Sequence, residues 1–527
     1  MNHSTPPPVS VVIVGTGFSG LAMAIQLAKD AAAGGPDDYV VIEKADDVGG
    51  TWRENTYPGC SCDVQSHLYS YSFAQNPRWS RMFAQQQEIW DYLRRCVDRY
   101  GLRPHIRFGT ELASAEFDDE TGLWRVETAP SAATQQSPAT GSGDDPRPGG
   151  LITARAVVLA KGPLHQPRHP DVPGMDSFAG RAFHSADWDH TYDVTGKRVA
   201  VIGTGASSIQ FLPRIARQAA AVTLVQRTPA WVMPKLDRKI SKTEQRWYAA
   251  LPALQRLYRA TIYWRNEIRV LGMHHPKAMR VFEAIGRRHI RRHVTDPELA
   301  RKLTPDFAVG CKRILISNDY YPALARDNVH VVTDGLARVT RTGIVTADGV
   351  EHPVDAIIYG TGFHVSTGFE DLRITGRHGV KLRDVWAKVP SPGRTHEGSR
   401  HLRKGPEAYL GTTVAGFPNL FLMLGPNSGL GHSSMVFMAE AQARYISDGL
   451  RLLRRTGARH LEVRGGVQER FNDVLQRKLS GAVWATGGCR SWYVDADGRN
   501  RTLWPGFTFS YWWRTRRLNP ADYVLTH

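Results

Sequence analysis

A glycine-rich turn near the start of the chain constrains its fold more than any other feature. The turn is Gly15-x-Gly17-x-x-Gly20, and it follows the apolar run 11–14 and precedes a helical pattern over 18–29. Glycines at this spacing permit a tight turn and let the backbone approach a pyrophosphate at a helix N-terminus. Because the turn joins a strand to a helix, it predicts a βαβ unit that binds a dinucleotide.

A second turn of the same kind lies in the middle of the chain. It is Gly203-x-Gly205-x-x-Ser208, after the apolar run 198–202 and before a strand predicted over 222–227. The third position is Ser, which is small enough to keep the helix packed on the strand. The sequence therefore predicts an α/β protein with two Rossmann-like dinucleotide-binding domains.

The residues at the ends of the following strands carry opposite charges. Glu43 ends the strand predicted over 39–43, where a carboxylate accepts ribose hydroxyls and repels a 2′-phosphate. Arg227 holds the matching position of the second unit, where a guanidinium suits the 2′-phosphate of NADP. These charges assign FAD to the first unit and NADPH to the second.

The chain has 527 residues and a formal net charge of +17. It contains no run of about 18 apolar residues, so we expect no integral membrane segment. Much of the charge lies in 235–302, where Arg287, Arg288, Arg291 and Arg292 have helical spacing, which favours a solvated helix face. No zinc-finger or RRM pattern indicates a nucleic-acid partner. Five cysteines, few and odd in number, favour a reducing, cytoplasmic setting.

Two longer patterns flank these units. One follows the first unit and reads Gly49-Gly50-x-Trp52-x-x-x-x-Tyr57-Pro58-Gly59-x-x-x-Asp63. The other precedes the second unit and reads Phe178-x-Gly180-x-x-x-His184-x-x-x-Trp188-Asp189. In these residues the chain resembles the type I Baeyer–Villiger monooxygenases. The resemblance covers essentially the whole chain, including the Gly-Thr-Gly of 360–362 and the Ser-Trp-Tyr of 491–493.

The resemblance implies an NADPH- and O₂-dependent flavin monooxygenase that converts ketones to esters or lactones through a C4a-peroxyflavin, and that also acts on sulfides. Such a site must stabilise negative charge, and Arg suits this task because its guanidinium keeps its proton. By resemblance, Arg313 is the catalytic cation and Asp63 is the partner that orients it. Lys312 joins Arg227 and Thr228 at the 2′-phosphate.

The same resemblance places further residues at the cofactors. Thr51 and Trp52 are expected against FAD, Tyr69 near Asp63 and Arg313, Leu112 on the adenine side, Met435 near the isoalloxazine and Trp492 at the nicotinamide ribose. The expected FAD contacts are Gly15, Gly17, Phe18, Ser19, Gly20, Glu43, Thr51, Trp52, Asp63, Tyr69, Leu112 and Met435. The expected NADP contacts are Gly203, Thr204, Gly205, Ala206, Ser207, Ser208, Gln210, Arg227, Thr228, Lys312 and Trp492.

The domain organisation follows from these placements. We expect the FAD-binding domain in 1–162 and 359–527, the NADP-binding domain in 163–234 and 309–358, and a helical insertion in 235–308. The Ser-, Pro- and Gly-rich stretch 130–150 is expected to be a loop. Shortly after Ser-Trp-Tyr the chain has 495–498 (Asp-Ala-Asp-Gly), where the cyclic-ketone enzymes of the family have a Gly-rich stretch. In this tail the chain resembles the branch of the family that accepts aryl and aliphatic ketones.

Three other functions stay open at this stage. An N- or S-oxygenating flavin monooxygenase shares the Phe/Gly/His pattern but usually lacks the Trp at position 188. A flavin disulfide reductase needs C-x-x-C, whereas Cys60 and Cys62 form C-x-C without a second half of a zinc site, so we interpret them as packing residues. A nucleic-acid binder rests on charge alone. His184 is either a residue that couples domain movement to catalysis or a buried structural histidine.

Overall fold

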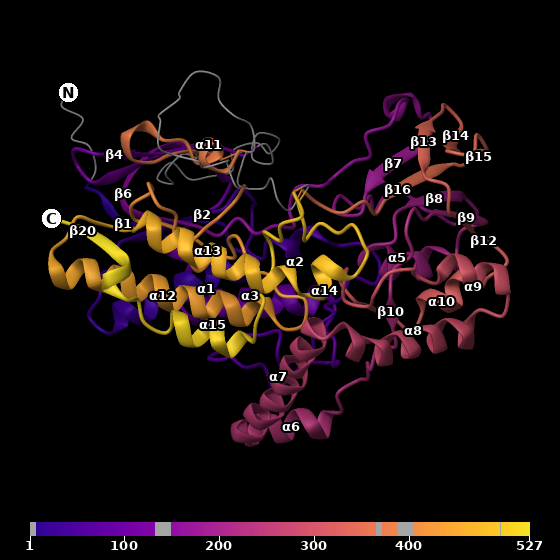
Figure 1. Ribbon diagram of the computed structural model, residues 1–527, viewed down its shortest axis with the longest axis horizontal. Coiled ribbons are helices and arrows are strands. Elements are labelled where there is room, and N and C mark those ends of the chain that lie inside the picture. Colours follow the sequence, from indigo (N-terminus) through magenta and orange to yellow (C-terminus); the bar gives the residue numbers. More distant parts are fainter. Residues whose placement is uncertain (1–6, 132–148, 365–371, 388–404, 496) are drawn as a thin grey trace.

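The computed structural model contains two large sheets in separate parts of the molecule, with a helical insertion below the smaller of the two (Figure 1). The residues that it describes are 7–131, 149–364, 372–387, 405–495 and 497–527. The described residues do not include 132–148, which make up most of the loop predicted over 130–150. They also do not include Ala496, in the segment 495–498. The α/β class predicted from the two glycine turns is confirmed.

The larger sheet has the order β17-β4-β5-β6-β1-β2-β3, with β18 beside β6. Its strands are β1 (Val9–Val14), β2 (Tyr39–Ile42), β3 (Ile106–Arg107), β4 (Thr110–Asp118), β5 (Leu123–Pro130), β6 (Gly150–Leu159), β17 (Arg373–Thr375) and β18 (Leu420–Leu422). β1 runs parallel to both β2 and β6, and Val12 and Ile13 are fully buried. Burial on both faces explains why this strand is a continuous apolar run.

Helices from both ends of the chain cover this sheet. α1 (Phe18–Ala32) packs on α12 (Met435–Thr456), so the last third of the chain completes the first domain. The other helices of this part are α2 (Thr51–Glu54), α3 (Gln86–Arg99), α11 (Leu382–Trp386), α13 (Gly465–Ser480), α14 (Val483–Thr486) and α15 (Thr508–Thr515). An antiparallel pair, β19 (His460–Val463) and β20 (Tyr523–Thr526), holds the C-terminus against this layer.

The smaller sheet is entirely parallel, with the order β12-β9-β8-β16-β7. Its strands are β7 (Arg181–His184), β8 (Arg198–Ile202), β9 (Ala221–Val225), β12 (Val329–Val332) and β16 (Ala356–Tyr359). α5 (Ser208–Ile215) and α10 (Tyr320–Leu324) pack together beside it, and the strands β13 (Leu336–Val339), β14 (Gly343–Thr346) and β15 (Glu351–Pro353) form a separate small sheet. The second predicted βαβ unit therefore spans β8, α5 and β9.

A parallel pair, β10 (Val232–Met233) and β11 (Leu315–Ile316), brackets the helical insertion. The insertion consists of α6 (Lys242–Ala250), α7 (Pro252–His274), α8 (Arg280–His293) and α9 (Pro297–Leu303), as the helical pattern predicted. The four clustered arginines of α8 are all exposed, which confirms a solvated face. Short 3-10 helices lie at Arg103–His105, Met175–Ser177, Pro276–Met279, Arg377–Gly379 and Pro520–Asp522. Within the described ranges, no helix combines the length and apolarity needed to cross a bilayer.

Candidate active site

The first glycine turn forms a cradle at the end of β1. Gly15 has a φ of +100°, a conformation that L side chains rarely adopt. A Cβ on Gly20 would lie 1.8 Å from the carbonyl oxygen of Gly15, so a side chain there would collide with the turn. α1 begins at Phe18 and points its N-terminus at this turn, with Ser19 buried in its first residues. The geometry therefore fits the pyrophosphate of a dinucleotide.

Glu43 lies directly after β2 and is buried beside this cradle. Its Oε2 accepts a hydrogen bond from the backbone N of Thr16 at 2.8 Å, and its Oε1 accepts one from the N of Ala45 at 2.9 Å. The carboxylate therefore braces the turn in addition to any contact with ribose. A carboxylate has about four acceptor positions, so these bonds leave capacity for a ribose hydroxyl.

The segment after Gly49 lies against the first cradle. A Cβ on Gly50 would lie 3.0 Å from the Cα of Gly17, so the two glycines make a close backbone contact. Trp52 follows in α2, and its Nε1 donates to the hydroxyl of Tyr69 at 3.1 Å. The ring of Tyr69 meets the edge of Phe18 at 5.0 Å between centroids.

Two other expected FAD contacts have different surroundings. Thr51 is the first residue of α2 and so lies beside the cradle. Leu112 lies in β4 and packs into the hydrophobic cluster that contains Val12 and Ile42. Their contact with the cofactor stays a prediction.

The second glycine turn repeats the geometry at the end of β8. Gly203 has a φ of +104°, and a Cβ there would lie 2.6 Å from the carbonyl oxygen of Gly360. Ser208 is fully buried, and its Oγ occupies the space that a Cβ on residue 360 would need, at 2.0 Å. The Ser at the third position is therefore accommodated because the facing strand is followed by Gly360. Thr204 closes the turn, with its Oγ1 donating to the carbonyl oxygen of Thr228 at 3.0 Å.

Of the other NADP contacts expected in this turn, Gly205 and Ala206 are exposed, and Ser207 precedes the first residue of α5. Gln210 behaves differently. Its Oε1 accepts from the Tyr57 hydroxyl at 3.0 Å, and its Nε2 donates to the carbonyl oxygen of Ser61 at 3.0 Å. Gln210 thus ties the second unit to the first, and its contact with NADP stays a prediction.

Two cations meet beyond the second cradle. Arg227 is exposed two residues after the end of β9, and Lys312 is half-buried. Burial and, next in size, the neighbouring Arg227 guanidinium lower the pKa of Lys312 below its usual value. Asp306 is the carboxylate that acts on this ammonium in the opposite direction, with a smaller effect. Two positive groups brought together in this way suit a doubly charged phosphate.

Arg313 and Asp63 form a two-pronged ion pair although 250 residues separate them. Arg313 Nε donates to Asp63 Oδ2 and Arg313 Nη2 donates to Asp63 Oδ1, both at 2.8 Å. The Asp63 carboxylate raises the pKa of Arg313 above its already high value, so this cation stays charged. The side chains retain 36% and 25% exposure, so the pair is open on one side. Both charges also act on the buried Tyr69 hydroxyl, so Tyr69 lies near the pair.

A disulfide fixes the segment that carries the cations. Cys311 directly precedes Lys312 and Arg313, and it is bonded to Cys489, with 6.1 Å between their Cα atoms. Tyr493 follows in the same C-terminal segment and is buried, which raises its pKa to about 12, while the nearby Arg313 opposes this shift. Trp492 is exposed and lies against Tyr493, with 4.4 Å between ring centroids.

Met435, expected near the isoalloxazine, is the first residue of α12. The Ser434 hydroxyl caps this helix by accepting from the N of Val436. His432, earlier in the loop, is buried and lies 3.3 Å from the Oε1 of Glu267 in α7. The helical insertion therefore contacts the loop in front of Met435.

The pattern 178–189 holds β7 at the edge of the smaller sheet. A Cβ on Gly180 would lie 2.5 Å from the carbonyl oxygen of Asp355 and 2.6 Å from the Phe178 ring. Trp188 packs on the rings of Phe183 and Phe211.

His184 is buried, and its Nδ1 accepts from the N of Ala186 at 3.1 Å. Burial, with a smaller effect of the nearby His169, lowers its pKa to about 4. His184 is therefore neutral at pH 7, as expected of a buried structural histidine.

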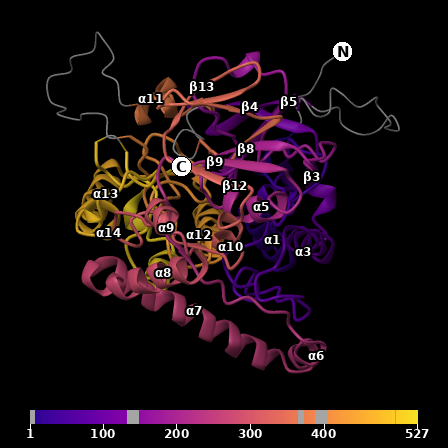
Figure 2. The ribbon, with the colours of Figure 1, turned by 90° about the vertical axis from the view of Figure 1, so that its right-hand side faces the viewer.

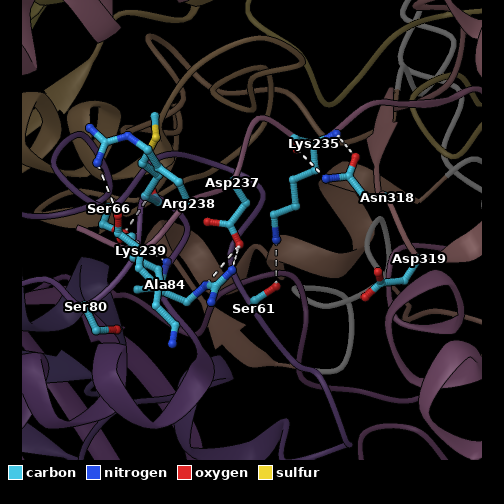
Figure 3. A network of polar contacts seen from close by, with 12 residues as sticks. Ser61, Ser66, Ser80, Ala84, Lys235, Asp237, Arg238, Lys239, Asn318 and Asp319 are labelled. Carbon is cyan, nitrogen blue, oxygen red and sulfur yellow. Dashed lines mark hydrogen bonds and ion pairs between the residues drawn. The ribbon is translucent and has the colours of Figure 1, made fainter. Parts of the chain in front are cut away.

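The segment that follows β10 contacts residues of distant parts of the chain, and Figure 3 shows Lys235 between Ser61 and Asn318. Lys235 donates from Nζ to Ser61 Oγ at 3.1 Å, and burial lowers its pKa. Asp237 pairs with Arg81 at 2.8 Å, and the Asn318 side chain donates to the carbonyl oxygen of Lys235 at 2.7 Å. These groups line a pocket of about 210 Å³. A larger hollow of about 700 Å³, near Asp46–Glu54 and Asp187, is lined by none of the predicted site residues.

The chain matches known proteins over almost its full length. The family described as flavin-binding monooxygenase-like matches residues 9–380. A Baeyer–Villiger monooxygenase of Pseudomonas aeruginosa is 48% identical, over 98% of this chain and 91% of that protein. A Baeyer–Villiger monooxygenase of Streptomyces coelicolor is 45% identical, over 98% and 92%. The crystal structure of OTEMO in complex with FAD and NADP has a TM-score of 0.83 at 28% identity, covering 99% of this chain and all of that one.

The two cradles, the matched sequence and the matched structure agree. The chain belongs to the flavin-binding monooxygenase-like family, and within it to the Baeyer–Villiger monooxygenases. The resemblance read from the patterns 49–63 and 178–189 is thereby confirmed.

Several residues of the site had no signal in the sequence. The Cys311–Cys489 pairing joins positions 178 residues apart, and a count of five cysteines gives no pairing. Cys60, Cys62 and Cys96 are the free cysteines among the described residues, and all are buried, which confirms the packing interpretation of the C-x-C pair. Lys235 was missed because it belongs to no motif with a fixed spacing, and Tyr493 was recognised as part of the Ser-Trp-Tyr of 491–493 but was given no role.

Proposed function

We propose that this protein catalyses the NADPH- and O₂-dependent oxidation of a ketone to an ester or lactone, with Arg313 as its catalytic cation and Asp63 as the residue that orients it. The observation that carries the proposal is the two-pronged Arg313–Asp63 pair. Asp63 belongs to the segment that lies on the first cradle, and Arg313 follows Lys312 beside the second. The pair therefore stands where the two cofactors meet.

FAD and NADPH are the cofactors, and when bound they supply the hydride transfer and the activation of O₂. The first cradle, with Glu43, Thr51, Trp52 and Met435, would hold FAD. The second cradle, with Arg227, Thr228 and Lys312 at the 2′-phosphate and Trp492 at the nicotinamide ribose, would hold NADPH. The fit rests on the close-packed glycines of both turns, since a Cβ on Gly20 or Gly203 would collide with the backbone, and on the paired cations.

Arg313 has two properties that the reaction needs. Oxygen transfer to a carbonyl group develops negative charge on oxygen, and a fixed guanidinium stabilises it without giving up a proton. The pKa of Arg313 is raised by Asp63, so the guanidinium stays charged throughout the working pH range. Its third nitrogen, Nη1, is not used in the two bonds to Asp63, and it remains for the substrate or the cofactor.

Asp63 fixes the plane of the guanidinium through both bonds, and Tyr69 lies between this pair and Trp52. Because orientation within a few tenths of an ångström decides the strength of such contacts, we expect Asp63 to act through Arg313 and not on the substrate itself. A ketone is the proposed main substrate, and a sulfide is a second substrate of the same site.

A product panel with isotopically labelled oxygen tests the proposed reaction. The purified enzyme, NADPH and ¹⁸O₂ are incubated with aryl, aliphatic and cyclic ketones and with sulfides, and the products are identified by mass spectrometry. We expect esters that carry one labelled oxygen, with aryl and aliphatic ketones ahead of cyclic ones. Sulfoxide without ester would assign the chain to heteroatom oxygenation, and hydrogen peroxide without either product would refute the proposal.

We also infer a cytoplasmic setting, from the small number of cysteines. The Cys311–Cys489 disulfide makes this testable, because a reducing compartment would favour its thiol form. Thiol labelling in intact cells, followed by mass spectrometry of the peptides that contain Cys311 and Cys489, reports the state. A fully oxidised pair would argue for an oxidising compartment.

A further inference from the structure

α7 presents an apolar stripe to the solvent. Leu257, Trp264, Ile268 and Leu271 are each between 51% and 64% exposed. Their spacings of seven, four and three residues place all four on one face of the helix. Scattered apolar residues are normal on protein surfaces, but a row of four large ones along a single helix marks an interaction surface.

The opposite face of α7 is held to the body by polar contacts. The Arg259 guanidinium donates to the carbonyl oxygens of His67 and Ser70 at 2.7 and 2.9 Å. Glu267 is buried and accepts from the backbone N and the hydroxyl of Thr508, at 2.7 and 2.9 Å. Because these contacts fix the rotation of the helix, the apolar stripe cannot turn inward.

The apolar surface extends beyond α7. The Trp264 ring lies 5.8 Å from that of Phe509 in α15, and Phe509 and Trp513 are exposed on that helix. Trp247 and Leu251, at the end of α6 next to α7, are exposed as well. Figure 2 shows α7 as a long rod along one edge of the molecule, with α6 at its far end.

The exposed charged side chains around this stripe are positive. Among the side chains described in 242–293, no carboxylate is exposed, because Glu244 and Glu283 are partly covered and Glu267 is buried. Ten cations of the same segment are exposed, namely Lys242, Arg246, Arg256, Arg265, Arg269, Arg280, Arg287, Arg288, Arg291 and Arg292. On α7, Arg256 and Arg265 stand about 80–100° to either side of the stripe, at the helical angle of 100° per residue.

We propose that α7 lies in the surface of an anionic lipid bilayer, with its apolar stripe among the acyl chains and its arginines among the headgroups. A helix with Trp and Leu on one face and arginines beside them has the properties of an interfacial helix. A second copy of this chain is a poorer occupant, because a two-fold contact would bring the cationic flanks of both helices together. An anionic headgroup layer neutralises them instead.

This location links the bilayer to the site. The buried Glu267 of α7 contacts His432, and Tyr263 of α7 stacks on Phe437, 5.3 Å between ring centroids. Met435 lies between these two contacts in the sequence. Apolar ketones partition into lipid, so a bilayer at α7 would hold them beside the loop that faces the flavin. This consequence rests on the proposed function, whereas the binding itself does not.

Vesicle sedimentation with the FAD-loaded full-length protein tests the proposal. Vesicles of phosphatidylcholine with roughly 30% phosphatidylserine, which supplies the anionic surface, are compared with vesicles of pure phosphatidylcholine. We expect binding to the anionic vesicles that falls as salt rises, because surface charges are screened. The readout needs no ketone and no turnover, so it is independent of the proposed reaction.

Three variants separate the contribution of the apolar stripe to vesicle binding from that of the cations. Leu257→Ser/Trp264→Ser/Ile268→Ser should weaken binding at least about tenfold, since affinity scales with buried apolar area. Arg246→Gln/Arg256→Gln should weaken binding to anionic vesicles by roughly 25-fold, because each of the two cations near such a surface contributes roughly fivefold. The matched control Val350→Ser/Val474→Ser/Val524→Ser changes three exposed apolar residues elsewhere and should leave binding unchanged.

All three variants alter exposed positions, and unchanged flavin content and melting temperature show that each remains folded. Absence of binding by the wild type, or equal binding of wild type and stripe variant, would overturn the proposal. A wild-type dimer in solution that the stripe variant abolishes, without vesicle binding, would assign the surface to a second copy and overturn it equally.

Discussion

The pairing of Arg227 with Lys312 makes a quantitative prediction about the choice between NADPH and NADH. If both groups contact the 2′-phosphate, each forms a charge-assisted hydrogen bond that contributes about 1.5–3 kcal/mol. At about 1.4 kcal/mol for each factor of ten, Arg227→Ala should raise the KM for NADPH roughly 10- to 150-fold. NADH lacks the phosphate, so its KM should change little, and the preference for NADPH should collapse by the same factor.

The lowered pKa of Lys312 predicts in which direction the KM for NADPH changes with pH. Lys312 binds phosphate in its charged form, and its pKa is lowered by burial and by Arg227. The KM for NADPH should therefore rise as pH increases through this lowered pKa. Arg227→Ala removes one cause of the lowered pKa of Lys312, so the rise in the KM for NADPH should occur at a higher pH. Lys312→Ala should abolish it.

Steady-state kinetics with both nucleotides from pH 6 to 10 provide the assay, with Arg341→Ala, an exposed arginine on another part of the second domain, as the control. A change of less than threefold in the KM for NADPH on loss of Arg227 would refute the reasoning. An equal rise in the KM for NADH would refute it too, because the effect would then be structural.

Three further predictions concern the frame of the site. Gly20→Ala should lower the flavin content of the purified protein, because its Cβ would lie 1.8 Å from the Gly15 oxygen. The control Gly335→Ala, whose Cβ would have no neighbour within 4 Å, should leave the flavin content unchanged, and equal tolerance of both changes would contradict the cradle geometry. Cys311→Ala/Cys489→Ala should lower the melting temperature, because the unfolded chain without the disulfide gains conformational entropy worth up to about 5 kcal/mol. A reductant should lower the melting temperature of the wild type but not that of the variant. Burial lowers the pKa of His184 to about 4, whereas its pKa in the unfolded chain is near 6.5. The free energy of unfolding should therefore fall by up to roughly 3 kcal/mol as pH decreases from 6.5 to 4. Thermal melts of His184→Gln should show a smaller loss of stability over this pH window.

Local patterns were sufficient to predict the two βαβ units. The run 198–202 coincides with β8, and the helix predicted from residue 18 begins at Phe18, because a buried apolar strand followed by a glycine turn leaves few alternatives. Asp63 and Arg313 came from the family patterns, and the structure brings them together across 250 residues. Composition alone would not have distinguished Lys312-Arg313 from other basic pairs.

The features that the sequence did not reveal are contacts between distant segments. The Ser at position 208 fits because Gly360 faces it, and that depends on the order of strands in the smaller sheet. A helical insertion was predicted over 235–308, but not which face of each helix would be buried. On α7 the polar residues Gln255 and Glu267 are buried together with the apolar Ile262, Val270 and Met273, whereas four other large apolar residues face outward.

The coupling of NADPH oxidation to ester formation in Arg313→Ala tests the central claim most directly. The account predicts that the variant binds FAD, oxidises NADPH and releases hydrogen peroxide, while the rate of ester formation falls about a hundredfold or more. Arg313→Lys should also lose coupling, since an ammonium cannot reproduce the two-pronged contact with Asp63. Ester formation by Arg313→Ala at the wild-type rate per NADPH oxidised would contradict the account.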